Sequence, residues 1–266
     1  MQCLCDFHIH STLSGDGKSD LLDQVRACWE AGVRWVCFTE HIDYGTSSGD
    51  FLVDFPLYRQ KIEAARAAFP GMTIGMGLEL GDTQEDRANV IAQADAVPLD
   101  YKLLSRHKVG GVDPYDADIF FAHRTRGQAV VDYLDAIYRS VTAFPDYDAL
   151  SHLGYVFKFV QSPEFPPLRY CDDPDRIDAI LRFLIENGKA LEVNTSRWRR
   201  FGDGMPGRDI LARYRELGGE LLTLGSDAHA TDSAAQGFAA ALEQIQGLGF
   251  RYLAAFSARE RTMLPL

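Results

Sequence analysis

Seven short segments rich in β-branched and aromatic residues recur along the chain, and longer stretches with helical periodicity separate them. The segments span residues 4–10, 34–41, 73–80, 101–108, 147–154, 189–195 and 220–227. Strands that alternate with helices in this way form βα units, whose strands run parallel in one sheet. Seven units favour a closed or nearly closed α/β barrel over the alternative, a doubly wound open sheet, because a barrel gathers all strand ends into one ring.

Three helices are the clearest, because each ends at glycine or proline. They are expected over 19–31, 56–69 and 174–187. Asp173 and Pro174 add an N-cap and a first-turn proline to the last one. The stretch 110–145 falls outside the strand–helix pattern, so we expect a lid or side insertion there, on a single domain that spans residues 1–266.

Composition narrows the classes of function. The net charge of −11 disfavours a nucleic-acid surface, which needs a basic face. The chain has no signal-like start and no run of 18 apolar residues, so we expect no membrane partner. Its five cysteines are odd in number and form no C-x-x-C pair, which predicts a reducing, cytoplasmic location rather than a disulfide framework. A monomer and a homodimer both remain open.

Six of the seven histidines lie in five short motifs, each at the carboxyl end of a predicted strand. The motifs hold His8 and His10 (DFHIHS), His41 (FTEH), His107 (SRHK), His152 (SHLG) and His229 (GSDAH). Barrel active sites lie at this end of the strands. Imidazoles grouped with carboxylates suit zinc, manganese, iron or cobalt, and this many ligands can hold more than one ion. The pattern therefore predicts a polynuclear metal site and a hydrolytic reaction. His123, in the expected insertion, is interpreted as an ordinary loop histidine.

Strand periodicity sorts the acidic residues near these histidines. Glu79 shares a face with two glycines, which leave room for a carboxylate that bridges metals. Asp227 is in phase with His229, and Glu192 with Asn194. Glu40 points away from His41 and is expected to have a structural role. Asp6, in phase with His8, is expected to orient a ligand imidazole.

The order of these motifs resembles that of the PHP phosphoesterases, and in particular their histidinol-phosphate phosphatase branch. The resemblance covers residues 6–229 and rests on H-x-H (8, 10), E-H (40, 41), Glu79, His107, His152, L-E-V-N-T (191–195) and S-D-A-H (226–229). It implies a distorted (β/α)7 barrel of the TIM type. It also implies three divalent ions of zinc, manganese or iron. Their ligands would be His8, His10, Glu79 and Asp227; Glu79, His107 and His152; and Asp16, His41 and His229.

The resemblance further implies hydrolysis of a small phosphate monoester, above all L-histidinol phosphate to L-histidinol and phosphate. A hydroxide that bridges the first two ions would attack, and the third ion would bind the phosphate. Asp227, His229 and Glu79 are the expected catalytic residues. Arg197 and Lys158 are the expected phosphate ligands, since arginine offers a two-pronged donor to phosphate and Lys158 is the basic residue nearest His152 in the sequence.

The sequence indicates the substrate-binding residues less clearly than the metal ligands. The segment after His152, LGYVFKF, lacks the aspartate and arginine that are frequent there in the family, and residue 40 is Glu where Asp is frequent. Histidinol phosphate would need carboxylates for its ammonium and a flat wall for its imidazole. Asp113, Tyr115 and Asp116 follow the fourth strand and could supply both, but solvated loop residues are the favoured interpretation.

Other functions stay open at this point. The chain could act on another small phosphate ester or a nucleotide. An amidohydrolase-type C–N hydrolase would use a carbamylated lysine, but Lys102 is out of phase with His107. A DNA-editing exonuclease would want a basic groove. A non-catalytic metal-binding domain predicts missing ligands, and none is missing.

Overall fold

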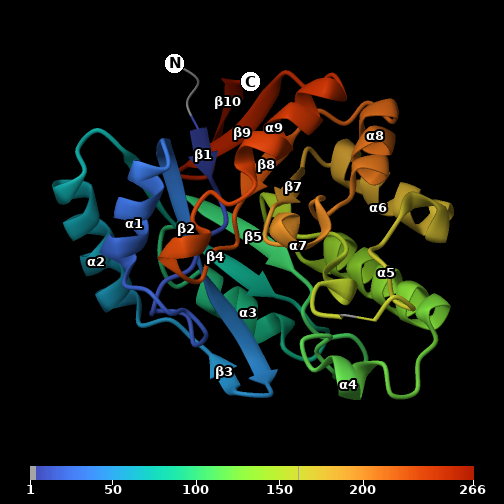
Figure 1. The fold of residues 1–266 in the computed structure, drawn as a ribbon. Helices are drawn as coiled ribbons and strands as arrows, with labels where there is room; N and C mark the ends of the chain where they lie inside the picture. The colour runs from blue at the N-terminus through green and yellow to red at the C-terminus, as the bar shows by residue number, and fades with distance from the viewer. Residues whose placement is uncertain (1–3, 161) are drawn as a thin grey trace.

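The computed structural model describes residues 4–160 and 162–266, and seven parallel strands form its centre (Figure 1). In spatial order they are β1 (Leu4–Asp6), β2 (Val33–Thr46), β4 (Thr73–Gly81), β5 (Tyr101–Ser105), β6 (Ala149–Leu150), β7 (Ala190–Asn194) and β8 (Leu222–Gly225). The chain beyond β8 also bonds to the chain beyond β1. The Phe7 N–H donates to the Leu224 carbonyl, and Ile9 pairs with Ala228 in a parallel bridge. The sheet is thus a nearly closed barrel, as predicted.

Helices alternate with these strands around the outside (Figure 1). The longer ones are α1 (Leu21–Glu30), α2 (Phe55–Ala68), α3 (Arg87–Ala94), α5 (Arg126–Ala143), α6 (Pro174–Glu186), α8 (Arg208–Glu216) and α9 (Phe238–Gly247). The three helices expected from the sequence are confirmed. Asp173 caps α6 by accepting from the Arg176 N–H, with Pro174 in the first position. Within the described ranges, no helix combines the length and apolar character needed to cross a bilayer.

Short elements shape the loops at the carboxyl ends of the strands. They are α4 (Ala117–Phe120), α7 (Trp198–Phe201) and the 3-10 turns η1 (Tyr155–Phe157), η2 (Tyr170–Asp172) and η3 (Thr231–Ser233). In addition, β2 runs on past the barrel and turns back as β3 (Gly49–Phe51), which pairs with it antiparallel. The strand predicted from the sequence ended at residue 41, so neither its extension nor the hairpin was predicted.

A second hairpin at the end of the chain was also missed. It consists of β9 (Tyr252–Ser257) and β10 (Glu260–Pro265), paired antiparallel. Phe256 packs 5.1 Å from the ring of Tyr101 and 6.3 Å from that of Phe7. The turn residue Arg259 bonds to Asp146 and Asp148, which precede β6. The hairpin therefore covers the amino ends of the strands, opposite the histidines.

The stretch expected as an insertion, 110–145, differs in part from that expectation. Its second half is α5, which connects the parallel strands β5 and β6 and packs against α6. Thr125 and Gln128 form a capping box at its start, and Tyr133 and Ile137 are among the residues on its buried face. This half is the crossover helix of a regular βα unit. Only the loop around α4 lies outside the barrel pattern.

Candidate metal centre

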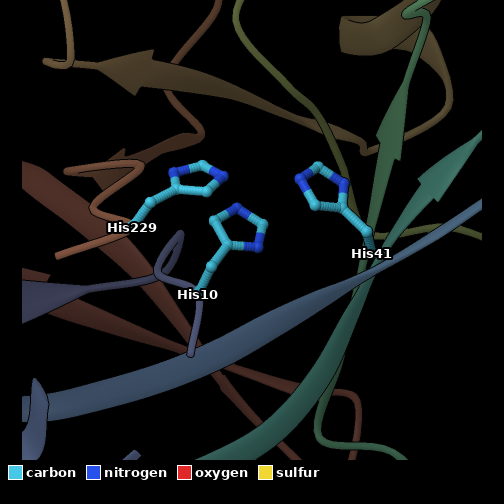
Figure 2. Close-up of side chains that lie close together, drawn as sticks. All are labelled: His10, His41 and His229. Atoms are coloured by element: carbon cyan, nitrogen blue, oxygen red, sulfur yellow. The ribbon is translucent and has the colours of Figure 1, made fainter. Parts of the chain in front are cut away.

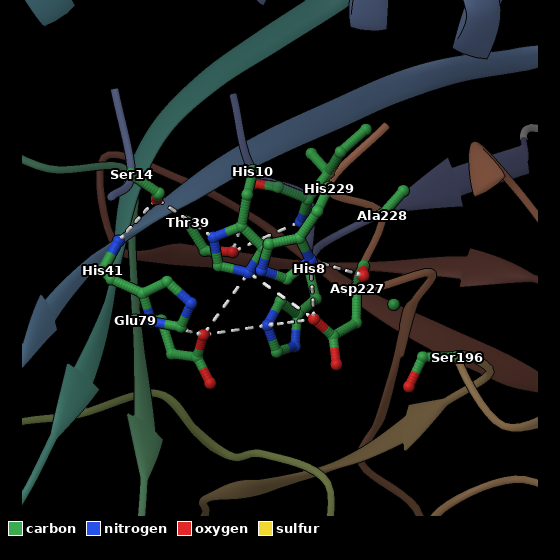
Figure 3. Close-up of polar contacts among 12 residues, drawn as sticks. His8, His10, Ser14, Thr39, His41, Glu79, Ser196, Asp227, Ala228 and His229 are labelled. Carbon is green, nitrogen blue, oxygen red and sulfur yellow. Dashed lines mark hydrogen bonds and ion pairs between the residues drawn. The ribbon is translucent and has the colours of Figure 1, made fainter. Parts of the chain in front are cut away.

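The strand ends bring five of the predicted histidine ligands together around one carboxylate, that of Glu79. Figure 3 shows His8, His10 and His41 beside it. Glu79 Oε1 lies 3.0 Å from His107 Nε2 and 2.8 Å from His152 Nε2. Glu79 Oε2 lies 3.1 Å from His8 Nε2, 3.2 Å from His41 Nδ1 and 3.4 Å from His10 Nε2. Its two oxygens therefore face two different sets of imidazoles, which is the arrangement needed to bridge two ions.

Two aspartates complete the ring of donors. Asp227 Oδ1 lies 3.7 Å from the Nε2 atoms of both His8 and His10 and 3.6 Å from His229 Nδ1. Asp16 lies 3.1 Å from His229 Nε2 and 3.7 Å from His41 Nε2. Two donors on one tetrahedral zinc ion, with bonds of about 2.0–2.2 Å, are roughly 3.3 Å apart. Most of these separations are close to that value.

Three imidazoles from three separate segments gather around one space (Figure 2). The ring of His10 stacks 4.3 Å from that of His41 and 4.2 Å from that of His229. Four groups of three donors each lie within 4.8 Å, and together they include every predicted ligand except Asp16. The groups are His10, His41 and His229; His8, His10 and Asp227; His8, Glu79 and His152; and His41, Asp43 and His107.

Two ring nitrogens in this centre are buried without a hydrogen-bond partner among the described residues. They are His10 Nε2 and His41 Nδ1. A buried polar atom left without a partner costs roughly 1–3 kcal/mol. Both atoms face carboxylate oxygens of other ligands. A divalent cation would satisfy them, so the donor set fits bound metal.

The buried imidazoles and carboxylates of the centre shift each other's pKa values. Burial opposes a charged ring, but Glu79, Asp43 and Asp16 outweigh it and raise the pKa of His41 to about 9. His10 is different, because burial and the neighbouring His229 hold its pKa well below the usual value. Burial disfavours the Glu79 carboxylate too, yet the surrounding imidazoles hold its pKa well below its ordinary range. Cations can therefore bind here in exchange for protons.

Two further carboxylates, those of Glu192 and Asp43, approach the Nδ1 atoms of His8, His107 and His41. Glu192 Oε1 lies 2.5 Å from His8 Nδ1, and its other oxygen accepts from the His152 N–H at 2.6 Å. Asp43 Oδ2 lies 3.0 Å from His107 Nδ1 and 3.2 Å from His41 Nδ1. Such carboxylates fix the tautomer and direction of a ligand imidazole. Asp43 was missed from the sequence, although it follows His41 at the two-residue strand period.

The two remaining acidic residues support the backbone. Asp6 accepts from the N–H groups of His8 and Ser226 and from the Ser226 hydroxyl. The expectation that Asp6 orients an imidazole is wrong, because these donors of the β1–β8 junction occupy its oxygens. Glu40 accepts from the hydroxyls of Ser11 and Ser14, each at 2.5 Å. Its expected structural role is confirmed.

The basic residues expected near the phosphate take different positions. Lys158 Nζ pairs with Asp227 Oδ2 and lines the pocket above the centre. Arg197 is buried, with its guanidinium 4.1 Å over the ring of Phe201, and it is absent from the residues that line this pocket. Two of its nitrogens, Nε and Nη2, have no hydrogen-bond partner among the described residues. Arg199 and Arg200, from the same R-W-R-R cluster, line the pocket instead.

A pocket of about 930 Å³ opens over the ligands. Its walls come from the β2–β3 hairpin, the loop after β5, η1, α7 and the loop that contains η3. Asp113 and Tyr115 line it, whereas Asp116 and His123 do not. The volume and the mixture of aromatic and charged walls suit one small organic molecule.

Comparison with known proteins gives one family. The model of the PHP domain matches residues 6–196. The chain is 30% identical to a histidinol-phosphatase of Lactococcus lactis over 256 residues, which cover 95% of this chain and 94% of the relative. It is 28% identical to a probable histidinol-phosphatase of Thermotoga maritima, with coverage of 94% and 95%. The crystal structure of the Lactococcus lactis histidinol phosphate phosphatase with zinc, L-histidinol and phosphate superposes with a TM-score of 0.87 at 29% identity, covering 97% of this chain and 98% of that one.

Proposed function

Since this chain belongs to the PHP domain family, we propose that it is a metal-dependent phosphatase that hydrolyses L-histidinol phosphate to L-histidinol and phosphate, a step of histidine biosynthesis. The observation that supports this most is the position of Glu79, which has five imidazole nitrogens within 3.4 Å. The alternative is another small phosphate ester at the same centre. The near-complete overlap with the histidinol-phosphatase relatives favours histidinol phosphate.

We assign three divalent ions to the centre. The first set of ligands is His8, His10, Glu79 and Asp227, the second is Glu79, His107 and His152, and the third is Asp16, His41 and His229. Zinc is the first choice because the Lactococcus lactis relative was crystallised with it, and manganese and iron are the alternatives. The unpartnered Nε2 of His10 supports the first set. The third set is supported by the approach of Asp16 to the Nε2 atoms of His41 and His229, at 3.7 Å and 3.1 Å.

When bound, such ions lower the pKa of a coordinated water and neutralise phosphoryl oxygens. The residues of the chain hold the ligands in position and line the pocket. Glu79 contacts imidazoles of the first and second ligand sets with its two oxygens. Asp43 and Glu192 fix the orientation of His107 and His8, so that their Nε2 atoms face Glu79. Asp227 and His229 line the pocket and belong to the ligand sets, which makes them the candidates for donating a proton to the leaving alcohol. We therefore assign Asp227, His229 and Glu79 to catalysis.

Lys158 and Arg197 are assigned to the phosphate. The Lys158 ammonium pairs with Asp227, a ligand of the first set, and Lys158 lines the pocket that the phosphate would enter. Two buried nitrogens of Arg197 have no acceptor within residues 4–160 and 162–266, as expected for a guanidinium that binds an anion from the substrate. To reach the pocket, its side chain must leave the ring of Phe201.

We also propose that residues 1–266 act as one catalytic domain in the cytoplasm, as a monomer or a homodimer. One continuous hydrophobic core supports the single domain, since it includes residues from Cys5 to Phe256. Light scattering of the purified protein measures the oligomeric state directly.

The experiment that tests the substrate is a phosphate-release assay with zinc-reconstituted protein. Histidinol phosphate is compared with sugar, nucleotide and amino-alcohol phosphates. A kcat/KM that is highest for histidinol phosphate supports the assignment. Preference for another ester would retain the phosphatase chemistry and remove the substrate, and no release from any ester would contradict the proposed function.

A further inference from the structure

One buried hydroxyl, that of Ser14, contacts two metal ligands and a carboxylate. Ser14 lies in the loop between β1 and α1 and is 4% exposed. Its Oγ donates to Glu40 Oε2 at 2.5 Å. The same oxygen lies 3.0 Å from the backbone nitrogen of His41 and 3.3 Å from His10 Nδ1 (Figure 3). Ser14 therefore joins a ligand of the first set to a ligand of the third.

The hydrogen-bonding capacity of serine fixes the direction of these contacts. A serine hydroxyl has one proton and two lone pairs. Glu40 accepts from the hydroxyls of Ser11 and Ser14 and from the Ser11 N–H. The Ser14 proton is thus directed at Glu40, and one lone pair accepts from the His41 N–H. Only the second lone pair is left for His10, so His10 Nδ1 is the donor in that contact.

This arrangement defines the tautomer of His10. A neutral imidazole has one N–H and one lone pair, and only the nitrogen with the lone pair can bind a cation. With the proton on Nδ1, the lone pair is on Nε2, which lies 3.4 Å from Glu79 Oε2 and has no hydrogen-bond partner among the described residues. At His8 and His107 a carboxylate approaches Nδ1 directly, whereas at His10 a serine stands between the carboxylate and the ring.

Ser14 also belongs to the tight turn that carries Asp16. The Ser14 N–H donates to the Ser11 carbonyl at 3.0 Å, and the Ser14 carbonyl accepts from the Gly17 N–H at 3.1 Å. A Cβ on Gly17 would lie 1.7 Å from the Ser11 carbonyl oxygen, so the turn can close only around a glycine. Asp16 is thereby held 3.7 Å from His41 Nε2.

Resting on the metal-dependent function proposed above, we propose that Glu40 and Ser14 are a pair of positioning residues for the metal ions. They place the proton of His10 on Nδ1, which leaves Nε2 available to the cation of the first set. They also hold the His41 backbone and the turn of Asp16 for the third set. Neither residue touches the reacting atoms, because Glu40 acts through Ser14 and Ser14 acts through the ligands.

The test compares two serines that bind the same carboxylate. Ser14→Ala removes the hydroxyl that contacts His10. Ser11→Ala is the matched control, since its hydroxyl donates to Glu40 but makes no hydrogen bond to an imidazole within the described residues. Zinc affinity is measured by competition with a chelator. We expect Ser14→Ala to weaken zinc binding by roughly 10- to 100-fold and Ser11→Ala to stay near the wild-type affinity.

A second readout is the tautomer itself, which does not depend on turnover. Nitrogen-15 NMR of the metal-free protein shows which ring nitrogen of His10 carries the proton. We expect Nδ1–H in the wild type and in Ser11→Ala. Glu40→Gln keeps the shape of the side chain, but an amide has one acceptor oxygen and cannot accept from both hydroxyls. Glu40→Gln and Ser14→Ala should therefore both show proton on Nε2 and weaker zinc binding.

Three results would overturn the proposal. They are equal losses of zinc affinity in Ser14→Ala and Ser11→Ala, a proton on Nε2 of His10 in the wild type, and wild-type zinc affinity in Ser14→Ala. Urea unfolding of the metal-free variants checks the fold, and Ser14→Ala decides alone if Glu40→Gln does not fold. Failure of the proposed function is distinct, because wild-type protein would then release no phosphate while zinc affinity and the tautomer still decide the role of the pair.

Discussion

Gly81 leaves the space that the carboxylate of Asp43 occupies, because a Cβ at residue 81 would collide with Asp43 Oδ1. Gly81 ends β4, two residues after Glu79, and Asp43 lies in the neighbouring strand β2. From this position Asp43 reaches His41 and His107, which are assigned to two different ions. A residue without a side chain therefore makes room for the carboxylate that contacts two of the candidate metal ligands.

We expect Gly81→Ala to displace Asp43 and to loosen both imidazoles. Loss of a carboxylate behind a metal ligand typically costs about 10–100-fold in metal affinity or activity. Zinc content after dialysis and kcat measure the effect, and Asp43→Asn should reproduce it. Gly127→Ala, in α5 where the added methyl meets nothing, is the control. Normal zinc content and kcat in Gly81→Ala would show that Asp43 does not hold the rings.

Removal of a ligand should have a larger effect. Asp227→Asn and His10→Ala each remove a donor of the first set, and both residues are buried. We expect kcat to decrease by more than the roughly 10–100-fold typical of a residue behind the ligands, with the fold retained. Circular dichroism checks the fold. Near-normal turnover by either variant, when well folded, would contradict the metal mechanism.

The metal-free protein should lose stability as the pH rises. The folded pKa of His41, about 9, lies above its ordinary value of 6.5. Its contribution is therefore fully present below pH 6.5 and is lost as the pH passes about 9. Because each pKa unit corresponds to about 1.4 kcal/mol, the loss is at most about 3 kcal/mol. Urea unfolding of chelator-treated protein at pH 6.5 and pH 10 measures it.

Zinc should reverse this trend, because a ligand imidazole must give up its proton to bind the ion. We expect zinc affinity to rise over the same pH interval and zinc binding to release protons into weakly buffered solution. The variant His41→Asn should show a smaller pH dependence of stability in the metal-free state. An equal dependence would assign the effect to other groups.

Lys158 and Arg197 are assigned to the phosphate, the group that all the candidate substrates share. We expect Lys158→Met and Arg197→Met to lower kcat/KM by roughly 10–100-fold for every phosphate ester, with or without an amine, since both are assigned to the phosphate. Arg199→Ala provides the comparison from the same segment. If Arg197→Met changed only the melting temperature, its contact with Phe201 would be its whole role.

The grouping of most candidate ligands was predictable because it follows from strand periodicity, whereas Asp16 was inferred from the family resemblance alone. His8 and His10, Glu79, and Asp227 each lie at a strand end and in phase with a neighbour, so the barrel alone brings them together. Asp43 was not predictable in this way. The sequence after His41, I-D-Y-G-T-S-S-G, has the polar and glycine residues of a loop, although β2 continues through it to pair with β3.

Contacts between segments that lie far apart in the chain could not be predicted from the sequence either. Asp6 is in phase with His8, yet its oxygens accept from Ser226, a residue that only barrel closure brings near. The residues of α5 have a clear helical pattern, but packing on α6 is what makes it a crossover helix. The last hairpin contains Ala254 and Ala255, which are poor indicators of a strand, and the pairing of β9 with β10 compensates for them.

The most direct test is turnover of L-histidinol phosphate while zinc is added back to metal-free protein. The account predicts no phosphate release without metal, a rise as zinc binds, and a plateau at about three bound ions per chain, the number of assigned ligand sets. Full turnover by metal-free protein, or none at any zinc content with manganese and iron equally silent, would contradict it.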